Sequence, residues 1–490
     1  MSPSSTPTSS TFDWLSFRPA VAWIAILSLV IITALGILAG VGGIVRLLFT
    51  GGSVAVGVLL YWRYPVLYIG YTWWLWFLTP LVRRLIDQQA GWQHPNIVLL
   101  APPLVTMISA ITLLRYLPGA HRQGGLPFIL GLASVFYGFL LGLIQNSLLG
   151  SAVALLNWLP PILFGFHLFV NWQQYAAFRQ NIQRTFLWGV LVMGAYGVWQ
   201  YLIAPDWDRF WLNNLDTPIF GTPEPLGIRV WSTLNSPQPF AAVMMAGLIL
   251  LLSNRDSLKF MATGVGYLSF LLSLARSGWL SWLAGLMIYI PSLKSHLQMR
   301  IIITLMLMAV LVVPLASVEP LASQIEPRLE SLQGIQEDGS YRARLDGYNE
   351  LLDEAITEFV GRGLGAQLES SSLGSRDSGV LTLLFSLGWM GSVPYITGIF
   401  LIFFKLFRGA EARFDTFASA ARAIAFGVFA QIGLNIAMLG VVGMVLWGFL
   451  GIGLAASRYY AQLNFLQVES NVAGARGTVP TRLSGLNRGY

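Results

Sequence analysis

Long apolar runs separated by short polar stretches make up most of the chain. The runs are bounded by Arg, Lys, Pro or Asn, and apolar and polar positions do not alternate within them as in barrel strands. A membrane span needs about 20 apolar residues with its backbone polar groups paired internally, so the runs predict membrane helices. We expect about 12 to 14 spans, at 19–41, 43–61, 63–81, 97–114, 126–144, 151–170, 186–204, 239–253, 260–275, 277–292, 301–318, 378–402, 417–440 and 442–457.

Composition indicates an all-α, polytopic membrane protein. The 490 residues have a mean hydropathy of +0.64, and 55% are hydrophobic but only 10% charged. A soluble domain cannot bury so much apolar sequence around one core. The absence of Cys excludes disulfides, thiolate catalysis and Cys-ligated metals. Basic residues at span ends are the commoner cause of a net charge of +7, so nucleic acid is not expected as a partner.

The distribution of charge predicts an orientation. With the N-terminus placed inside, the inner segments carry 18 of the 29 Lys and Arg residues but only 5 of the 22 acidic residues. Cytoplasmic segments are enriched in Lys and Arg, so both termini are expected in the cytoplasm and loop 319–377 outside. Arg83 and Arg84 fall outside in this scheme, and we attribute them to a local error in the bounds assigned within 43–81.

The chain divides into membrane helices and three polar regions. The first dozen residues and the tail after about Gln467 are polar and low in aromatics, which predicts disorder. The expected regions are a disordered N-terminus at 1–18, membrane helices at 19–318, the large outside loop at 319–377, further membrane helices at 378–457 and a cytoplasmic, disordered tail at 458–490.

Two outside loops differ in character. Loop 205–238 holds Trp207, Phe210, Trp211, Phe220 and Trp231 among Pro and Gly. Such aromatics are typical of an anchor at the membrane interface, and the alternative is a platform for stacking sugars.

Loop 319–377 carries twelve acidic residues against five Arg. Within it, apolar residues recur at spacings of three and four, which predicts a partly helical loop with one apolar face. That face holds Tyr341, Leu345, Tyr348, Leu352, Ile356 and Phe359. Ser340 is a plausible N-cap, and Gly361 and Gly363 can end the helix.

Several arginines are expected on the outer side of the membrane. Arg276 falls between two apolar runs, where an ionisable group is costly and usually faces a partner or a cavity. A snorkelling anchor is the alternative for a single Arg. Arg229, Arg342 and Arg344 lie on the same side of the predicted topology. Guanidinium groups bind phosphate oxygens bidentately, so such a cluster predicts a site for an anion such as pyrophosphate.

The same arginines carry a resemblance to a known family. The segment Ala275-Arg276-Ser277-Gly278-Trp279-Leu280 is similar to the Ser-Arg-Gly-Ala-Trp-Leu segment of the O-antigen ligase and polymerase family. The segment from Arg229 to Gln238 resembles the family's Arg-x-x-Gly-Thr-Phe-x-x-Pro-Asn segment, with Ser232 for Gly and Gln238 for Asn. Arg344 and Tyr348, followed by Gly361-Arg-Gly363-Leu-Gly365, resemble its Arg-x-x-x-Trp helix and Gly-x-Gly-x-Gly turn. The resemblance covers roughly residues 60–460.

This resemblance implies a membrane glycosyltransferase of the bacterial inner membrane with a GT-C-like fold. The implied donor is a glycan on a polyprenyl pyrophosphate, and membrane lipids and other polysaccharide assembly proteins are implied partners. Arg229, Arg276 and Arg344 would bind the pyrophosphate, assisted by Arg342 and Arg376. No metal or nucleotide cofactor is implied, because a pyrophosphate leaves well once its charge is neutralised.

The chain departs from the family at the residue expected to act as the base. Family ligases carry His-Asn-x-x-Leu after the large loop, whereas this chain has Ser375-Arg376-Asp377-Ser378-Gly379. Asp377 is either the base or the N-cap of the next helix. Glu369 and the loop residue His94 are the next candidates.

The missing His also bears on which function the resemblance implies. It favours a polymerase over a ligase, and it leaves open a catalytically inactive member of the family. A transporter of an inorganic anion such as bicarbonate is the rival, because proteins resembling this family have been proposed as inorganic-carbon transporters in photosynthetic bacteria. A transporter should hold its substrate near mid-membrane, whereas these arginines gather at one face.

Overall fold

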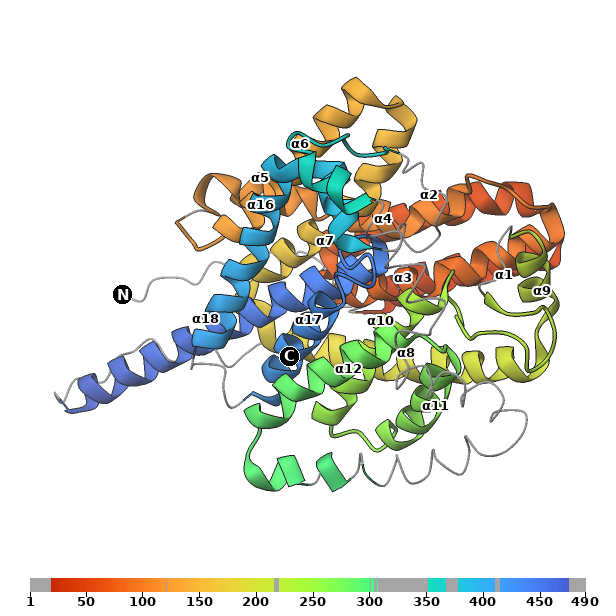
Figure 1. The fold of residues 1–490 in the computed structure, drawn as a ribbon. Helices are drawn as coiled ribbons and strands as arrows, with labels where there is room; N and C mark the ends of the chain where they lie inside the picture. Colours follow the sequence, from red (N-terminus) through yellow and green to blue (C-terminus); the bar gives the residue numbers. More distant parts are fainter. Residues whose placement is uncertain are drawn as a thin grey trace, which may run out of the picture.

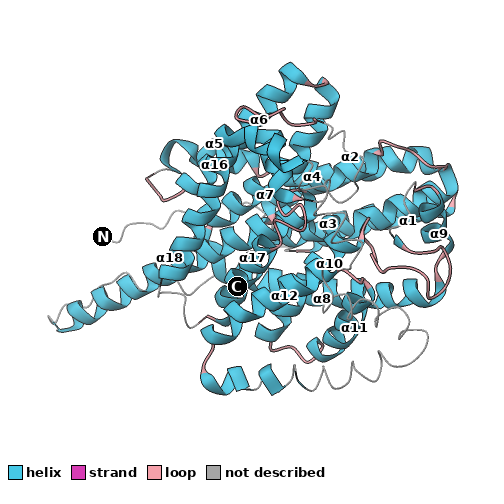
Figure 2. Cartoon of the chain, in the orientation of Figure 1, coloured by secondary structure: helices cyan, strands magenta, loops and turns pink. Residues whose placement is uncertain are grey.

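The computed structural model describes residues 19–120, 122–215, 220–299, 301–303, 306, 351–366, 378–409 and 415–475. In these ranges the regular structure is helical, and the described chain contains no strand beyond an isolated bridge between Gly221 and Ile228. Figure 2 shows this all-helical architecture.

The first group of helices precedes a long connection around α9. It comprises α1 (Ala20–Leu38), α2 (Gly42–Arg63), α3 (Pro65–Ala90), η1 (Ile97–Leu100), α4 (Ala101–Met107), α5 (Ala110–Ala120), α6 (Leu126–Gln145), α7 (Leu148–Val170), η2 (Trp172–Gln174) and α8 (Tyr175–Ile203). The second group comprises α9 (Asp206–Asn213), α10 (Pro237–Ser253), α11 (Lys259–Leu272), α12 (Arg276–Tyr289), η4 (Ile290–Ser292), α16 (Gly379–Arg408), α17 (Thr416–Ala430) and α18 (Gly440–Ala475).

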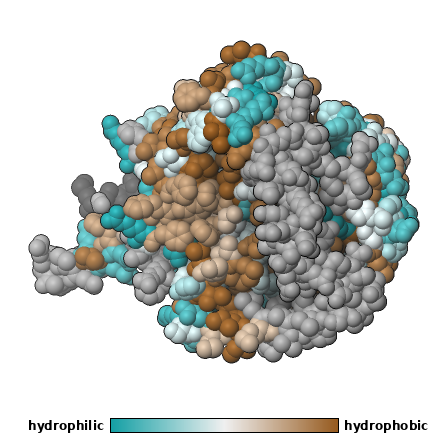
Figure 3. All heavy atoms as spheres, viewed as in Figure 1, coloured by the Kyte–Doolittle hydropathy of each residue, from teal (hydrophilic) through white to brown (hydrophobic). Residues whose placement is uncertain are grey.

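The apolar surface identifies this bundle as a polytopic membrane protein. Eight helical segments in the described ranges are long and apolar enough to cross a membrane. Large apolar side chains of α1, such as Ile24 and Leu38, are more than half exposed. In Figure 3 apolar residues form a band from the top to the bottom of the view, and hydrophilic residues gather toward its edges. Such a band is stable against lipid but not against water.

The centre of the bundle is the pair α7 and α18 (Figure 1). Gly165 and Gly451 face each other there, and a methyl group added to either would collide with the backbone of the opposite helix. Small residues let membrane helices approach closely where no hydrophobic effect drives them together. Trp447 fills the space beside this contact and donates to the Tyr395 hydroxyl at 2.9 Å.

Two buried polar networks mark opposite ends of α8. At its start, the carboxylate of Asp415 accepts from the hydroxyls of Tyr175 at 2.6 Å and Tyr460 at 2.9 Å. Near its end, Gln200 donates to Asp208 at 2.8 Å. From Tyr175 to Gln200 the helix rises about 38 Å, slightly more than the ~30 Å hydrocarbon core of a bilayer.

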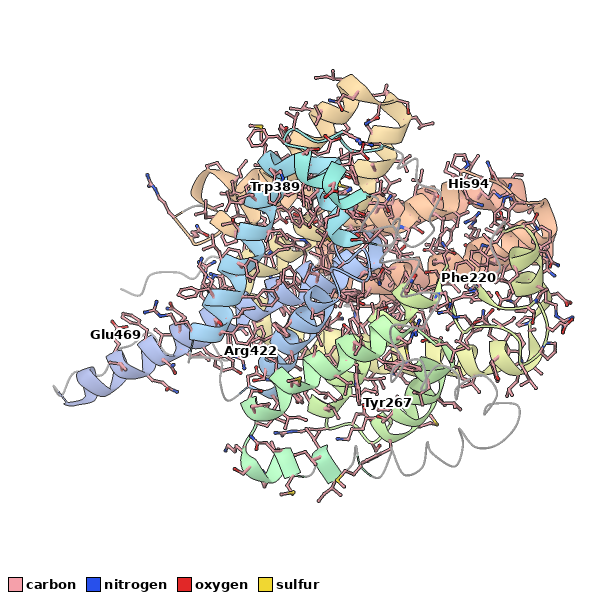
Figure 4. All side chains as sticks on the ribbon, in the orientation of Figure 1. His94, Phe220, Tyr267, Trp389, Arg422 and Glu469 are labelled. Atoms are coloured by element: carbon pink, nitrogen blue, oxygen red, sulfur yellow. The ribbon has the colours of Figure 1, made fainter. Side chains whose placement is uncertain are left out.

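We call the end of the bundle at Asp415 the basic face and the end at Asp208 the site face. Lys405, Arg408 and Arg458 lie on helices near the basic face. Figure 4 shows Glu469, on α18 beyond the basic face, far from His94 and Phe220 at the other end. Helices α1, α2 and α3 alternate between the two faces, because Arg46 near the start of α2 bonds to Asp87 near the end of α3.

Several predicted bounds are corrected by the structure. Helix α3 runs to Ala90, past the predicted end at 81, and the predicted span 97–114 is divided into α4 and α5. Helix α18 continues to Ala475, so the part of the tail before that residue is helical where disorder was expected. Its sequence after residue 457 is polar but contains neither Pro nor Gly before Gly474, and α-helical hydrogen bonds therefore continue.

The apolar face predicted for the acidic loop is confirmed at Leu352, which packs on the cluster at α16, but is wrong at Ile356 and Phe359. Leu351 and Ala355 are the buried residues, and they pack on Leu381, Leu384 and Phe385 of α16. Ile356 and Phe359, predicted to be covered, are 49% and 63% exposed. They lie beside α16, where Trp389 Nε1 donates to the Ile356 carbonyl at 2.8 Å. The predicted residues before 351 lie outside the described residues.

Candidate functional site

The turn between α11 and α12 brings two of the predicted arginines together. The backbone N–H of Val230 donates to the Leu272 carbonyl at 3.1 Å. Arg229 Nη2 reaches the carbonyl oxygens of Ser273, at 3.5 Å, and Leu274, at 3.2 Å. Arg276 is the first residue of α12, two positions further on. Both arginines are partly exposed at this turn, which we call the arginine turn.

Backbone conformation is strained on both sides of this turn. Ser232 has a φ of 53° and Leu274 a φ of 51°, values that residues with a Cβ rarely adopt. Ser232 stands where the resembling motif has Gly. Its N–H donates to Gln200 Oε1 at 2.8 Å and its hydroxyl to the Met193 carbonyl at 2.6 Å, which offsets the strain. Strain of this kind gathers at functional sites, because surrounding contacts must hold it in place.

A buried ion pair fixes the segment that carries Arg229. Arg84 Nη1 lies 3.0 Å from Asp208 Oδ1, and both side chains are fully buried. Arg84 Nη2 also donates to the Ser232 carbonyl at 2.5 Å. Gln200 connects the ion pair to the segment that carries Arg229, since it donates to Asp208 and accepts from the N–H groups of Trp231 and Ser232.

Arg83 and Arg84 conflict with the orienting rule partly because the helix bound predicted at 81 is wrong, since α3 extends to Ala90. Both lie inside α3 and both are buried. Arg83 pairs with Asp87 at 3.1 Å, and the same carboxylate accepts from Arg46 at 2.7 Å. The orienting rule concerns arginines that flank spans in loops, whereas these are neutralised within the bundle. Their conflict with that rule was the sequence signal for this network, which our sequence analysis missed.

Two helices begin beside the arginine turn without a side-chain cap. Neither Ala275 before α12 nor Ser236 before α10 makes a side-chain cap hydrogen bond. The two helices lie against each other near their starts, since Gly278 packs on Ala241. The first N–H groups of a helix carry partial positive charge, and two parallel starts next to two arginines favour an anion.

The glycine motif within the acidic loop is a wedge between helices and more than a helix stop. Gly361, Gly363 and Gly365 all have φ between 77° and 89°. A methyl group on each would meet the backbone of α16, α6 or α7. Leu364 N–H donates to the Gly138 carbonyl at 2.8 Å, and Asn146 donates to the Arg362 carbonyl at 2.8 Å. These contacts attach this part of the loop to three helices, and Figure 1 shows the segment near the top of the view.

Arg362, within this wedge, is held by acidic neighbours. Its guanidinium donates to Glu358 at 2.8 Å and also to Glu354. Burial alone would lower the pKa of Arg362, but the two carboxylates raise it above its usual value. The guanidinium also lies 4.6 Å from the Phe385 ring centroid. It is thus engaged by its own neighbours in the wedge.

Four predicted site residues lie outside the described residues: Arg342, Arg344, Arg376 and Asp377. The structure nevertheless bears on the alternative role of Asp377. The N-cap of α16 is Ser378, whose hydroxyl accepts from the Leu381 N–H at 3.3 Å. The N-cap role that was considered for Asp377 is therefore filled by its neighbour.

The aromatic loop and His94 have structural positions. Trp211, Phe220 and Trp231 pack against one another with ring centroids 5.4 to 6.0 Å apart. Trp231 is fully buried and Trp211 is 3% exposed, so these two form a small core and neither anchor an interface nor stack sugars. His94 lies in an exposed loop next to Pro95.

The fold and these networks define a class, an all-α polytopic membrane protein with a buried polar layer at one face. Comparison of the sequence with models of known families found no match, and comparison with curated proteins found none either. The likeness to O-antigen ligases and polymerases thus rests on the motifs of this sequence.

Proposed function

We propose that this protein is a membrane glycosyltransferase that transfers or polymerises glycan from a polyprenyl pyrophosphate donor. A polymerase is preferred over a ligase because the family-type His before α16 is absent. The observation that supports the proposal is the arginine turn. There Arg229 contacts the carbonyls of Ser273 and Leu274, and Arg276 begins α12.

The proposed reaction forms one bond and breaks one. The oxygen of an acceptor hydroxyl bonds to the anomeric carbon of the donor sugar, and the bond from that carbon to the pyrophosphate oxygen breaks. Asp377 takes the hydroxyl proton. The guanidinium groups of Arg229 and Arg276 neutralise the leaving pyrophosphate. Arg344, with Arg342 and Arg376, is assigned to the same anion by the resemblance.

The proposed location is the bacterial inner membrane, with both termini in the cytoplasm and the site face outside. The basic face carries Arg179, Lys405 and Arg408, which supports a cytoplasmic position for it. A donor lipid would enter laterally from the bilayer, so its pyrophosphate would meet the site face at the depth of the headgroups.

Binding of the bare leaving group tests this proposal. Purified protein in lipid nanodiscs is expected to bind polyprenyl pyrophosphate, and Arg276→Lys and Arg229→Lys should each weaken that binding about tenfold or more, since hydrogen bonds between charged groups are lost. Arg255→Lys, exposed between α10 and α11, is the matched control and should bind normally. Unchanged binding by both site variants would remove the arginine turn from the proposal.

Anion transport is the second candidate, and one feature favours it. Helices α4 and α5 are interrupted at Ile108 and Ser109, and the Tyr68 hydroxyl donates to the Val105 carbonyl at 2.9 Å beside the interruption. Discontinuous helices line substrate sites in many transporters. Bicarbonate uptake by protein-containing liposomes, without any release of polyprenyl pyrophosphate from lipid-linked glycan, would favour this alternative.

A further inference from the structure

Three carboxamide groups lie at the site face with unpartnered polar atoms. Gln431 directly follows α17 and is 2% exposed, and neither its Nε2 nor its Oε1 has a hydrogen-bond partner among the described residues. Asn435 is 7% exposed and its Nδ2 has none in the same ranges. The buried Oδ1 of Asn235 likewise lacks a partner there. The proposed arginine site uses none of these groups.

Helix packing places Gln431 beside the arginine turn. Helices α12 and α17 are antiparallel, because Gly285 packs on the Ala423 carbonyl and the Ser281 hydroxyl donates to the Gly427 carbonyl. One helical turn outward from that second contact leads to Ser277 on α12 and to Gln431, the residue that follows α17. Gln431 is therefore level with the residue that follows Arg276.

The other two amides belong to neighbouring helix starts. The Gly379 N–H at the start of α16 donates to the Ile432 carbonyl at 2.9 Å, and Gly379 also packs on the carbonyl of Asn435. Asn235 precedes α10 by two residues, and α10 packs on α12. All three amides thus lie at the end of the bundle where α10, α12 and α16 begin.

The three amides suit a different ligand group from the one that the arginines suit. Buried polar groups almost always have partners in folded proteins, so several unpartnered amides in one place call for a ligand. The free atoms include two carbonyl oxygens, Gln431 Oε1 and Asn235 Oδ1, which only accept hydrogen bonds. A fully ionised pyrophosphate has no hydrogen to donate. A hydroxyl both donates and accepts, and can therefore serve amide oxygens and N–H groups alike.

We infer that Gln431, Asn435 and Asn235 form a hydroxyl-binding subsite that holds a sugar next to the arginine turn. This inference rests on the proposed function, since it adds the glycan to the pyrophosphate site. The amides orient the sugar through its hydroxyls while the arginines hold the adjoining pyrophosphate. Gln431, the most deeply buried of the three, contributes most to sugar recognition.

Two ligands separate this subsite from the arginine site. Purified protein in nanodiscs is tested with bare polyprenyl pyrophosphate and with the lipid-linked glycans extracted from cells that carry the gene. Gln431→Leu should bind the bare lipid normally but the lipid-linked glycan at least tenfold more weakly. Asn181→Leu is the matched control, because Asn181 also has a buried, unpartnered amide oxygen but lies near the basic face, two residues after Arg179. It should bind both ligands normally.

Each outcome decides a different point. Normal binding of the lipid-linked glycan by Gln431→Leu would overturn the subsite while the arginine site stands, and so would equal weakening for both lipids. If the unaltered protein binds neither lipid, the proposed function fails and the subsite fails with it. The thermal midpoint without ligand should not fall in Gln431→Leu, because an unpartnered amide is replaced by an apolar group. Should that variant not fold, Asn235→Leu is expected to show the same selective loss.

Discussion

Asp377 and Ser378 have adjacent positions but different expected roles. Ser378 is the N-cap of α16, and Asp377 is the proposed base. We expect Asp377→Asn to lower polymer formation about 10²- to 10⁴-fold, because an amide cannot take the proton. Ser378→Ala should cost about 1 kcal/mol of stability and little rate. Polymer yield at matched expression distinguishes them, and near-normal yield from Asp377→Asn would mean that the base lies elsewhere, with Glu369 and His94 next.

The Arg84–Asp208 ion pair is expected to affect the stability of the fold. Both side chains are fully buried, so removing one charge leaves the other uncompensated. Asp208→Asn should lower the free energy of unfolding by about 3–5 kcal/mol. The double variant Arg84→Met with Asp208→Leu should recover much of that loss, since no charge remains buried. A double variant no more stable than Asp208→Asn, measured as thermal midpoint in detergent, would argue against this account of the pair.

At the scale of elements, the glycine wedge should be the most sensitive backbone segment. Gly363 has a φ of 77°, and a methyl group there would collide with the backbone of Gly142. Gly363→Ala is expected to destabilise the fold by roughly 2–4 kcal/mol, from left-handed strain plus overpacking. Gly264 lies in α11 with nothing within 4 Å of an added methyl group, so Gly264→Ala is the control. Equal thermal midpoints for the two variants would contradict the wedge.

The sequence predicts elements better than it predicts their interruptions. Apolar runs identify spans such as 126–144, observed as Leu126–Gln145, because burial in lipid demands helix over the whole run. The irregularity at Gly388 in α16 has another origin. Trp389 and Met390 donate their N–H groups to the carbonyls of Glu358 and Phe359, so the wedge segment replaces helical hydrogen bonds. That contact depends on tertiary packing, which no local pattern contains.

The arginine turn also depends on tertiary contacts that no local sequence pattern contains. The motifs around Arg229 and Arg276 were visible in the sequence, and the structure places both at one turn. The residues that hold this turn were not visible as a group. Arg84 and the Ser232 carbonyl are 148 positions apart, and each residue alone resembles an ordinary polar residue. The amide groups at Gln431 and Asn435 carry no motif either, and only helix packing places them near the turn.

At the scale of the whole molecule, the orientation in the membrane can be tested directly. The chain has no Cys, so single Cys residues can be introduced without removing others. Ser331→Cys, in the acidic loop, should react with an impermeant maleimide in intact spheroplasts. Gln462→Cys, exposed on the projecting part of α18, should react only after the membrane is opened. The reverse pattern of labelling would invert the proposed topology.

The central claim is that the arginine turn supports transfer of glycan from a polyprenyl pyrophosphate. Cells that lack the gene should accumulate short lipid-linked glycans, which can be extracted as substrate. The decisive measurement is the reaction of that substrate with purified protein in liposomes. We expect longer glycans together with released polyprenyl pyrophosphate, and a loss of about 100-fold in the rate for Arg276→Lys. Full activity in Arg276→Lys, or no release of polyprenyl pyrophosphate by the unaltered protein, would contradict it.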